Sequence, residues 1–232
     1  MATENLGWGA PRIQGELLEL GIHISQRTVS LHLMPHRRKP PSQTWRTFLA
    51  NHVGTLACID FLTVLSATFR VFSVFLVLSV DRRRVVHWNV TSGASVEWTA
   101  QQIVEAFPED TAPRYLLRDR DGVYAGAFSK RISGLGIREV RTAPHSPWQN
   151  PFVERLVGSV RHDCLDNVIV LGEARLREIL KSDFAYYHRA STHLSLAKDA
   201  PERRPVQAPS AGQIVAFPEV GGLHHLYERR AA

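Results

Sequence analysis

The chain has 232 residues, of which 44% are hydrophobic, enough for one main domain with a filled core and a small additional segment. Its 28 Lys and Arg residues exceed its 22 Asp and Glu residues, and this formal net charge of +6 favours a polyanionic partner, nucleic acid first. Two distant cysteines exclude a disulfide framework or a thiolate zinc site, and no apolar run is long enough to cross a bilayer. We therefore expect a cytoplasmic protein with no membrane partner.

The N-terminal segment carries two short helical patterns joined by a turn. Apolar residues recur at helical spacing from Pro11 and stop at Gly21, and Ser25 then stands where the N-cap of a second helix belongs. A basic stretch with prolines, residues 36–41, predicts a linker because proline prevents regular backbone pairing. We expect residues 1–45 to be separate from the main domain.

The main domain begins with three strand-like segments and continues with alternating helices and strands. Segments rich in Val, Ile, Phe and Thr predict an antiparallel meander. The expected strands cover residues 54–62, 70–79, 85–91, 115–117 and 137–140, and the expected helices cover residues 95–107, 128–135, 150–164 and 173–188. This order predicts an α/β fold over residues 46–200, with a mixed five-stranded sheet flanked by helices. Because prolines recur beyond Pro201, we expect residues 201–232 to form a loosely structured, proline-rich tail.

Two aspartates stand where strands are expected to end. Asp60 interrupts an otherwise apolar strand, and Asp119 directly follows another apolar run. Because a buried carboxylate usually has a cationic partner, each aspartate is explained either by an ion pair with an arginine or by a metal site. Strand ends that converge on one edge of a sheet are where open α/β proteins place their sites, so the two aspartates can share metal ions.

The helix expected at residues 150–164 offers a third carboxylate. Asn150, Glu154 and Arg161 are separated by four and seven residues, which places them on one helical face. This stripe is polar, whereas the other positions of the helix are largely apolar. Because exposed glutamates are common, the spacing alone leaves open both a solvated surface residue and a metal ligand.

Together these residues resemble the catalytic triad of the DDE superfamily, which contains retroviral integrases and bacterial insertion-sequence transposases. Asp60, Asp119 and Glu154 follow the order of that triad, with 34 residues between the last two. The words DRDGVY, starting at Asp119, and SPWQNPFVE, ending at Glu154, are similar to local motifs of the family. The resemblance covers residues 50–200. It implies a ribonuclease-H-like catalytic core that cleaves DNA ends and joins them to target DNA.

The resemblance implies that the three carboxylates are catalytic and bind metal. Carboxylate oxygens suit Mg²⁺ or Mn²⁺, and two such ions can activate an attacking oxygen and stabilise the leaving one. The turn of the family has glycine two residues after its aspartate, whereas Asp121 occupies that position here and Gly122 follows. Counting back from the aromatic Tyr124 selects Asp119 as the ligand. Asp121 remains the alternative, and a turn-forming role would explain its position next to glycine.

The resemblance also implies DNA as the partner, in the form of mobile-element ends and target DNA. It places a DNA contact at Arg161. The other candidates are Arg120, His145, Trp148, Gln149 and Asn150 around the site, and Arg27, Arg37, Arg38 and Lys39 in the N-terminal segment. The helix pair in that segment resembles the helix-turn-helix that precedes the core of insertion-sequence transposases, and a plain helical hairpin is the alternative.

The resemblance also leads to expectations about the whole protein. Members of the family usually carry further DNA-binding helices upstream, so we expect one frame of a two-frame element or a truncated remnant. A second polypeptide with such helices is then a candidate partner. We expect a homo-oligomer on DNA, associated with the nucleoid of a bacterial cytoplasm. The alternatives are a structure-selective nuclease on the same fold and a DNA-binding remnant without catalysis.

Two further groups of residues allow more than one explanation. Arg82, Arg83 and Arg84 stand between two expected strands, where either a solvated turn or a contact with DNA phosphate accounts for them. The stretch from Tyr186 to His193 is similar to the end of the family's core. We interpret it mainly as packing, with DNA contact as the alternative.

Overall fold

The computed structural model describes residues 9–33, 44–108, 110–144 and 146–231. The chain divides into two units, Met1–Phe48 and Leu49–Ala232. Four of the predicted DNA-binding residues lie outside the described residues: Arg37, Arg38, Lys39 and His145.

The first unit contains both helices predicted near the N-terminus. Helix α1 (Ala10–Glu19) is followed by a turn, and helix α2 (Gln26–Leu33) comes next. The hydroxyl of Ser25 accepts a hydrogen bond from the backbone N–H of Thr28 at 3.1 Å, so Ser25 caps α2 as its position suggested. The apolar faces of the two helices bury a small cluster made of Ala10, Ile13 and Val29.

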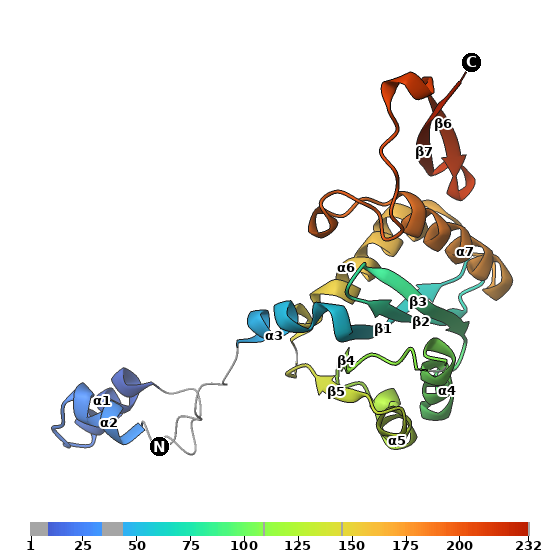
Figure 1. Ribbon diagram of the computed structural model, residues 1–232. Coiled ribbons are helices and arrows are strands. Elements are labelled where there is room, and N and C mark those ends of the chain that lie inside the picture. Colours follow the sequence, from blue (N-terminus) through green and yellow to red (C-terminus); the bar gives the residue numbers. More distant parts are fainter. Residues whose placement is uncertain (1–8, 34–43, 109, 145, 232) are drawn as a thin grey trace. The chain divides into compact units, whose positions relative to one another are not determined.

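The second unit is built on a five-stranded mixed sheet, as the sequence pattern predicted (Figure 1). Its strands are β1 (Leu56–Leu65), β2 (Val71–Ser79), β3 (Arg84–Thr91), β4 (Tyr115–Arg118) and β5 (Arg138–Arg141). They lie in the order β3-β2-β1-β4-β5. The first three form the expected antiparallel meander, while β4 pairs in parallel with β1 and β5 pairs in parallel with β4.

Helices cover both faces of this sheet (Figure 1). They are α4 (Val96–Ala106), α5 (Ala127–Gly134), α6 (Pro151–Ser159) and α7 (Glu173–Ala190). The first two pack on one face, and the last two contact the meander on the other face. The interior strand β2 is almost entirely apolar for this reason, and Leu76, Val77 and Leu78 are fully buried. No helix of the described residues has both the length and the apolar character needed to cross a membrane.

Two helical segments differ from the expectation. Helix α3 (Trp45–His52), which spans the boundary between the two units, was not predicted. The single helix expected at residues 150–164 is instead α6 followed by a π-helical segment, Val160–Cys164. The buried positions of both segments are three or four residues apart, a spacing that fits α- and π-hydrogen bonding alike, so periodicity could not reveal the change.

The expectation of a loosely structured tail was wrong. Strands β6 (Gln213–Glu219) and β7 (His224–Arg230) form an antiparallel hairpin with its own two-stranded sheet. Gly221 and Gly222 adopt positive φ in the turn between them, a conformation that glycine adopts without strain. Most prolines that suggested irregular structure precede the hairpin, and Pro218 lies within β6.

Candidate active site

The parallel pairing of β1 and β4 brings two predicted carboxylates level with each other. Cys58 of β1 lies opposite Leu117 of β4. Asp60 and Asp119 each follow two residues later, so the same register brings these two aspartates next to each other. Asp119 directly follows β4, as expected. Asp60 does not stand at a strand end, because β1 continues to Leu65. The chain therefore places a carboxylate inside an apolar strand, directly beside the edge at which β4 ends.

One cavity of about 450 Å³ is lined by all three predicted carboxylates. Asp60 comes from β1, Asp119 from the turn after β4 and Glu154 from α6, and the rival ligand Asp121 lines the same cavity. The rest of the lining consists of Arg120, Thr142, Ala143, Pro144, Ser146, Pro147 and Asn150. The structure thus gathers the predicted triad from three separate elements.

The carboxylates that line the cavity lie close enough to raise the pKa of Asp60. Burial raises the pKa of Asp60 from 3.8 to about 7, although a hydrogen bond from the N–H of Phe61 at 2.8 Å lowers it. The charges of Glu154, Asp119 and Asp121 raise it further. Within the described ranges, no Lys, Arg or His forms a salt bridge with any of these four carboxylates. Such a group is stabilised by a bound cation.

Both aspartates of the turn accept a backbone hydrogen bond, Asp119 from the N–H of Asp121 at 3.1 Å, but only Asp119 affects the pKa of Glu154. Asp119 raises the pKa of Asp60, and it also raises the pKa of Glu154, which burial raises first. The carboxylate of Asp121 accepts a hydrogen bond from the N–H of Val123 at 3.1 Å and caps a short helical turn. Asp121 therefore has the turn-forming contact that its position next to glycine suggested, while Asp119 interacts with both other members of the triad.

The donor set of the cavity fits a hard divalent cation. Carboxylate oxygens are the ligands that Mg²⁺ and Mn²⁺ prefer. The buried Oδ1 atom of Asn150, which lines the cavity, has no hydrogen-bond partner, so it adds an unpaired oxygen acceptor. Among the residues that the structure describes, no three His, Cys, Asp or Glu side chains are already close enough to hold an ion. A cation held by all three carboxylates would therefore require these side chains to move closer together, and those of Asp119 and Glu154 are both exposed.

Arg118, which the sequence analysis did not select, supports the turn that carries Asp119. Its buried guanidinium forms a salt bridge with Glu139 at 2.6 Å. It also donates hydrogen bonds to the carbonyl oxygens of Asp119 at 2.7 Å and Tyr124 at 3.2 Å, which fixes both ends of the turn. An arginine at the end of an apolar strand was the sequence signal for this role, since a buried charge needs partners.

Asn150 and Gln149, two of the predicted DNA-binding residues, make hydrogen bonds that hold the start of α6 and the loop before it. The buried Asn150 donates a hydrogen bond from Nδ2 to the carbonyl oxygen of Ile59 at 3.2 Å, which fastens the start of α6 to β1. Gln149 accepts a hydrogen bond from the N–H of Ala143 at 2.7 Å, which braces the loop before α6. Both residues therefore shape the wall of the cavity.

The remaining described candidates have more accessible positions. Trp148 is 69% exposed, and Arg27 is exposed on α2 in the first unit. Arg120 lines the cavity and donates a hydrogen bond to the carbonyl oxygen of Thr142 at 2.8 Å. Arg161 is exposed in the π-helical segment, outside the lining of the carboxylate cavity, and donates a hydrogen bond to the carbonyl oxygen of Thr63 at 3.4 Å.

One segment of the chain matches a known protein family. Residues 135–201 match the model of the family described as integrase core domain. No curated protein matches the sequence. The fold is similar to a chain of the simian T-cell lymphotropic virus intasome in complex with PP2A regulatory subunit B56 gamma, with 14% identity, a TM-score of 0.53 and coverage of 74% of this chain and 65% of that chain. This chain therefore spans about 65% of the length of the viral chain.

Two structures of Mos1 transposase are also similar. The catalytic domain with raltegravir and Mg has 14% identity, a TM-score of 0.52 and coverage of 61% of this chain and 78% of that chain. The Mos1 strand transfer complex has 13% identity, a TM-score of 0.51 and coverage of 79% of this chain and 68% of that chain. At such identities the similarity concerns the fold, which is the ribonuclease-H-like fold of integrase and transposase catalytic domains.

Proposed function

We propose that this chain is a member of the superfamily of DDE transposases and retroviral integrases, and that it is a metal-dependent enzyme that cleaves DNA ends and joins them to target DNA. A fold alone supports many activities, so the proposal rests on the site. The observation that carries it is that Asp60, Asp119 and Glu154 line one cavity, where no cationic side chain of the described residues forms a salt bridge with them.

Asp60, Asp119 and Glu154 would hold one or two Mg²⁺ or Mn²⁺ ions. When bound, these ions supply activation of the attacking oxygen and stabilisation of the leaving oxygen in an in-line phosphoryl transfer. The chain itself holds the ligands in place. Asp60 is fixed within β1, and Asp119 follows β4 with its carbonyl held by Arg118. Glu154 comes from a helix whose start is tied to β1 through Asn150.

Other side chains of the cavity suit the binding and orientation of a DNA strand. The Nε–H group of Arg120 donates a hydrogen bond to the carbonyl oxygen of Thr142. The terminal guanidinium nitrogens of Arg120 can then donate hydrogen bonds to a phosphate of the substrate. Trp148 is exposed beside the cavity-lining Pro147 and can stack on an unpaired base. The reaction needs no nucleophile from the protein, because water or a DNA 3′-OH attacks the phosphate.

DNA is therefore the proposed partner, at both the mobile-element end and the target. The similar viral structure is described as an intasome and one Mos1 structure as a strand transfer complex, which supports this assignment. The helix pair of the first unit, with exposed Arg27, and the basic residues Arg37, Arg38 and Lys39 of the sequence are proposed as further DNA contacts. We also propose that the protein acts as a homo-oligomer on DNA.

The experiment is a joining assay with Mn²⁺ on labelled duplexes taken from the DNA that flanks the gene, with a supercoiled plasmid as the target. We expect the wild-type protein to join the 3′-OH end to the plasmid and Glu154→Gln to lose at least about a hundredfold in rate, because a metal ligand is removed. Glu178→Gln is the matched control, since Glu178 is an exposed glutamate on α7. Cutting without joining would identify a nuclease, and binding alone would identify an inactive remnant.

A further inference from the structure

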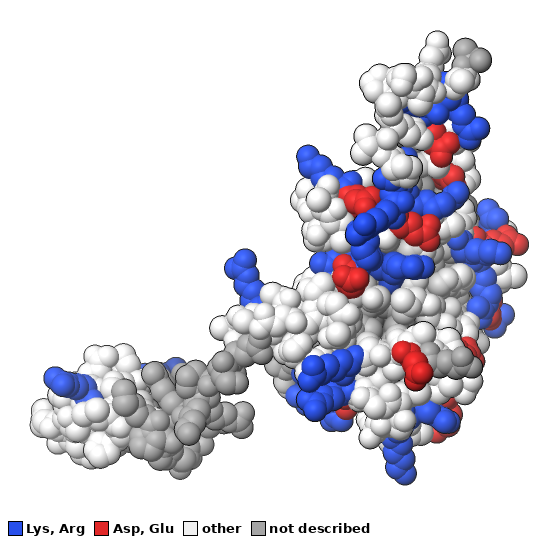
Figure 2. Space-filling view, viewed as in Figure 1, with Lys and Arg blue, Asp and Glu red and all other residues white. Residues whose placement is uncertain are grey.

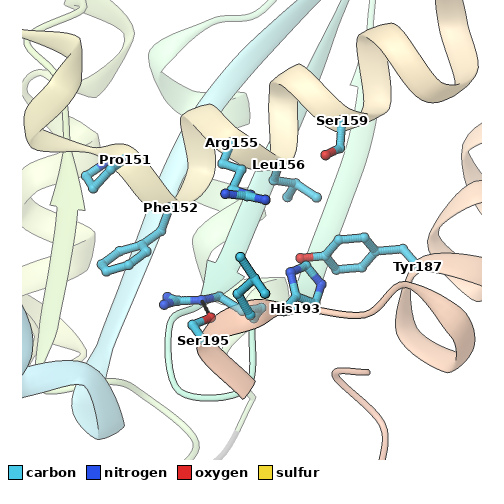
Figure 3. Close-up of a pocket in the computed structure, with 10 residues that line it drawn as sticks. Pro151, Phe152, Arg155, Leu156, Ser159, Tyr187, His193 and Ser195 are labelled. Carbon is cyan, nitrogen blue, oxygen red and sulfur yellow. Dashed lines mark hydrogen bonds between the residues drawn. The ribbon is translucent and has the colours of Figure 1, made fainter. Parts of the chain in front are cut away.

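A second cavity, of about 310 Å³, lies along α6 and shares no lining residue with the carboxylate cavity. Its walls come from α6, from the turn between β2 and β3, and from the end of α7 with the segment that follows it (Figure 3). Glu154 lines the first cavity and Arg155 lines the second. Consecutive helical residues differ in direction by about 100°, so α6 presents a different side chain to each cavity.

Three nitrogen-bearing side chains face this second cavity without a carboxylate partner. Arg155 is exposed and makes no hydrogen bond or salt bridge with the described part of the chain. Arg83 forms no salt bridge with the described residues either, although it donates hydrogen bonds to the carbonyl oxygen of Val80 at 3.0 Å and to Ser195 at 3.3 Å. The Nε2 atom of His193 is buried and has no hydrogen-bond partner.

The cavity has an unbalanced positive potential. Burial lowers the pKa of His193, and Arg155 and Arg83 lower it further. Burial also lowers the pKa of Arg83, and Arg155 lowers it further, whereas Tyr187, Cys58 and Asp81 raise it. No Asp or Glu lines the cavity. A bound anion would relieve this repulsion, as an opposite charge favours the charged forms.

The shape and the other walls of the cavity suit a phosphodiester. Arg155 extends from α6 on one side, while His193 and Tyr187 extend from the other side toward the same space (Figure 3). Phe152 provides an apolar wall, and its ring lies 4.0 Å from the Arg83 guanidinium carbon, which orients that guanidinium. Charged donors beside an apolar wall match a phosphate attached to a sugar.

We propose that this pocket binds a backbone phosphate of DNA, through Arg83, Arg155 and the Nε2 atom of His193. The proposal rests on the proposed function and extends it, because it adds a DNA contact on α6 away from the carboxylates. A strand held at Arg155 is positioned by the same helix that carries Glu154. The pocket therefore fixes the DNA relative to the reacting phosphate.

The test compares Arg155→Gln with Arg175→Gln in DNA binding measured by fluorescence anisotropy on the full chain. Both changes remove one positive charge, and Arg175 is an exposed residue of α7 that pairs with Glu178. Between about 50 and about 200 mM KCl, we expect the slope of log affinity against log salt to fall by about one for Arg155→Gln and to stay at the wild-type value for Arg175→Gln. Arg155→Lys should restore most of the slope, because it keeps the charge.

Equal slopes for the two glutamine variants would overturn the proposal. If inorganic phosphate then raised the melting temperature of the wild-type protein and of Arg175→Gln but not of Arg155→Gln, the pocket would be a site for a small free anion instead. Wild-type joining activity combined with equal slopes would leave the proposed function standing. A reduced slope for Arg155→Gln in a protein that never cuts or joins DNA would uphold the pocket and contradict the proposed function.

Discussion

Asp60 on β1 and Glu139 on β5 are carboxylates of the same sheet. Their surroundings shift their pKa values in opposite directions. Burial and three nearby negative charges raise the pKa of Asp60 to about 7. Partial burial raises the pKa of Glu139, but hydrogen bonds from Arg141 and Arg118 outweigh this effect and lower it. Glu139 is thus part of a structural ion pair, whereas Asp60 has the unsatisfied charge expected of a functional site.

The two aspartates of the turn should differ in their effect on the reaction. We expect Asp119→Asn to reduce the joining rate at least about a hundredfold, because Asp119 interacts with both Asp60 and Glu154. Asp121→Asn should keep most of the activity, because the amide oxygen can still accept the hydrogen bond from Val123. Single-turnover joining rates in Mn²⁺ measure both. An active Asp119→Asn beside an inactive Asp121→Asn would show that Asp121 is the ligand.

The role of Arg118 predicts a loss of stability. Arg118→Ala should lower the free energy of unfolding by about 3 kcal/mol, because it removes the buried cation that pairs with Glu139 and leaves two carbonyl oxygens of the turn without their donor. Arg141→Ala is the matched control, since the Arg141 side chain is 49% exposed and pairs with the same glutamate. That change should cost less than about 1 kcal/mol. Urea unfolding measures both, and equal losses would contradict a special role for Arg118.

At the scale of elements, strands covered on both sides were the easiest to predict. The apolar run in β2 was visible in the sequence because both of its faces are buried. The π-helical segment after α6 was not predictable, since spacing at every third or fourth residue fits either hydrogen-bonding pattern. Arg161 lies in that segment and donates a hydrogen bond to the carbonyl oxygen of Thr63, and its DNA contact stays a prediction.

The packing of α7 against the π-helical segment predicts a pH dependence of stability. Burial raises the pKa of Asp183 from 3.8 to about 6, and Asp163 raises it too, while a hydrogen bond with Cys164 lowers it. Between these two values the folded protein binds more protons than the unfolded chain. The contribution of Asp183 to stability is therefore fully present below pH 3.8 and is lost as the pH rises through about 6.

Asp183→Asn should remove this part of the pH dependence. Above pH 6 the variant should be more stable than the wild-type protein by up to about 3 kcal/mol, since a shift of one unit corresponds to about 1.4 kcal/mol. Thermal or urea unfolding between about pH 4 and about pH 8 measures the difference. Glu178→Gln, a change at an exposed carboxylate of the same helix, should leave the profile unchanged. A profile of Asp183→Asn that equals the wild-type profile would contradict the assignment.

At the scale of the whole molecule, the basic side chains are distributed over both units. Lys and Arg gather in several places on the face of the molecule drawn in Figure 2, one of them over β5, where Arg138 and Arg141 are exposed. The sequence adds Arg37, Arg38 and Lys39 to the exposed Arg27 of the first unit. A DNA duplex that contacts both units would release more counterions than one that contacts a single unit.

Removing the first unit should therefore weaken the salt dependence of DNA binding. We expect deletion of residues 1–43, which keeps α3 intact, to lower the slope of log affinity against log salt by about one for each phosphate contact that is lost. Anisotropy titrations of the full and shortened chains on one duplex measure this slope. The same slope in both proteins would show that the first unit does not hold DNA phosphates.

Long-range features of the molecule set the limit of sequence-based prediction. The convergence of Asp60, Asp119 and Glu154 on one cavity was predictable because motifs surround Asp119 and Glu154 and their spacing is distinctive. The second cavity was not, because Arg83, Arg155 and His193 come from three distant segments that carry no common motif. The C-terminal hairpin was not predicted because prolines precede it. In the structure the hairpin is joined to α7 by a salt bridge of 3.1 Å between Glu219, at the end of β6, and Arg189.

The measurement that tests the central claim most directly is the affinity for Mn²⁺ in the presence of a DNA duplex, by isothermal titration calorimetry. We predict that the wild-type protein binds Mn²⁺ and that Asp60→Asn weakens binding at least about tenfold, because a charged ligand is removed. Asp163→Asn, which removes an exposed aspartate outside the carboxylate cavity, should bind Mn²⁺ like the wild-type protein. Equal affinities for wild type and Asp60→Asn would contradict a metal-dependent catalytic site at these carboxylates.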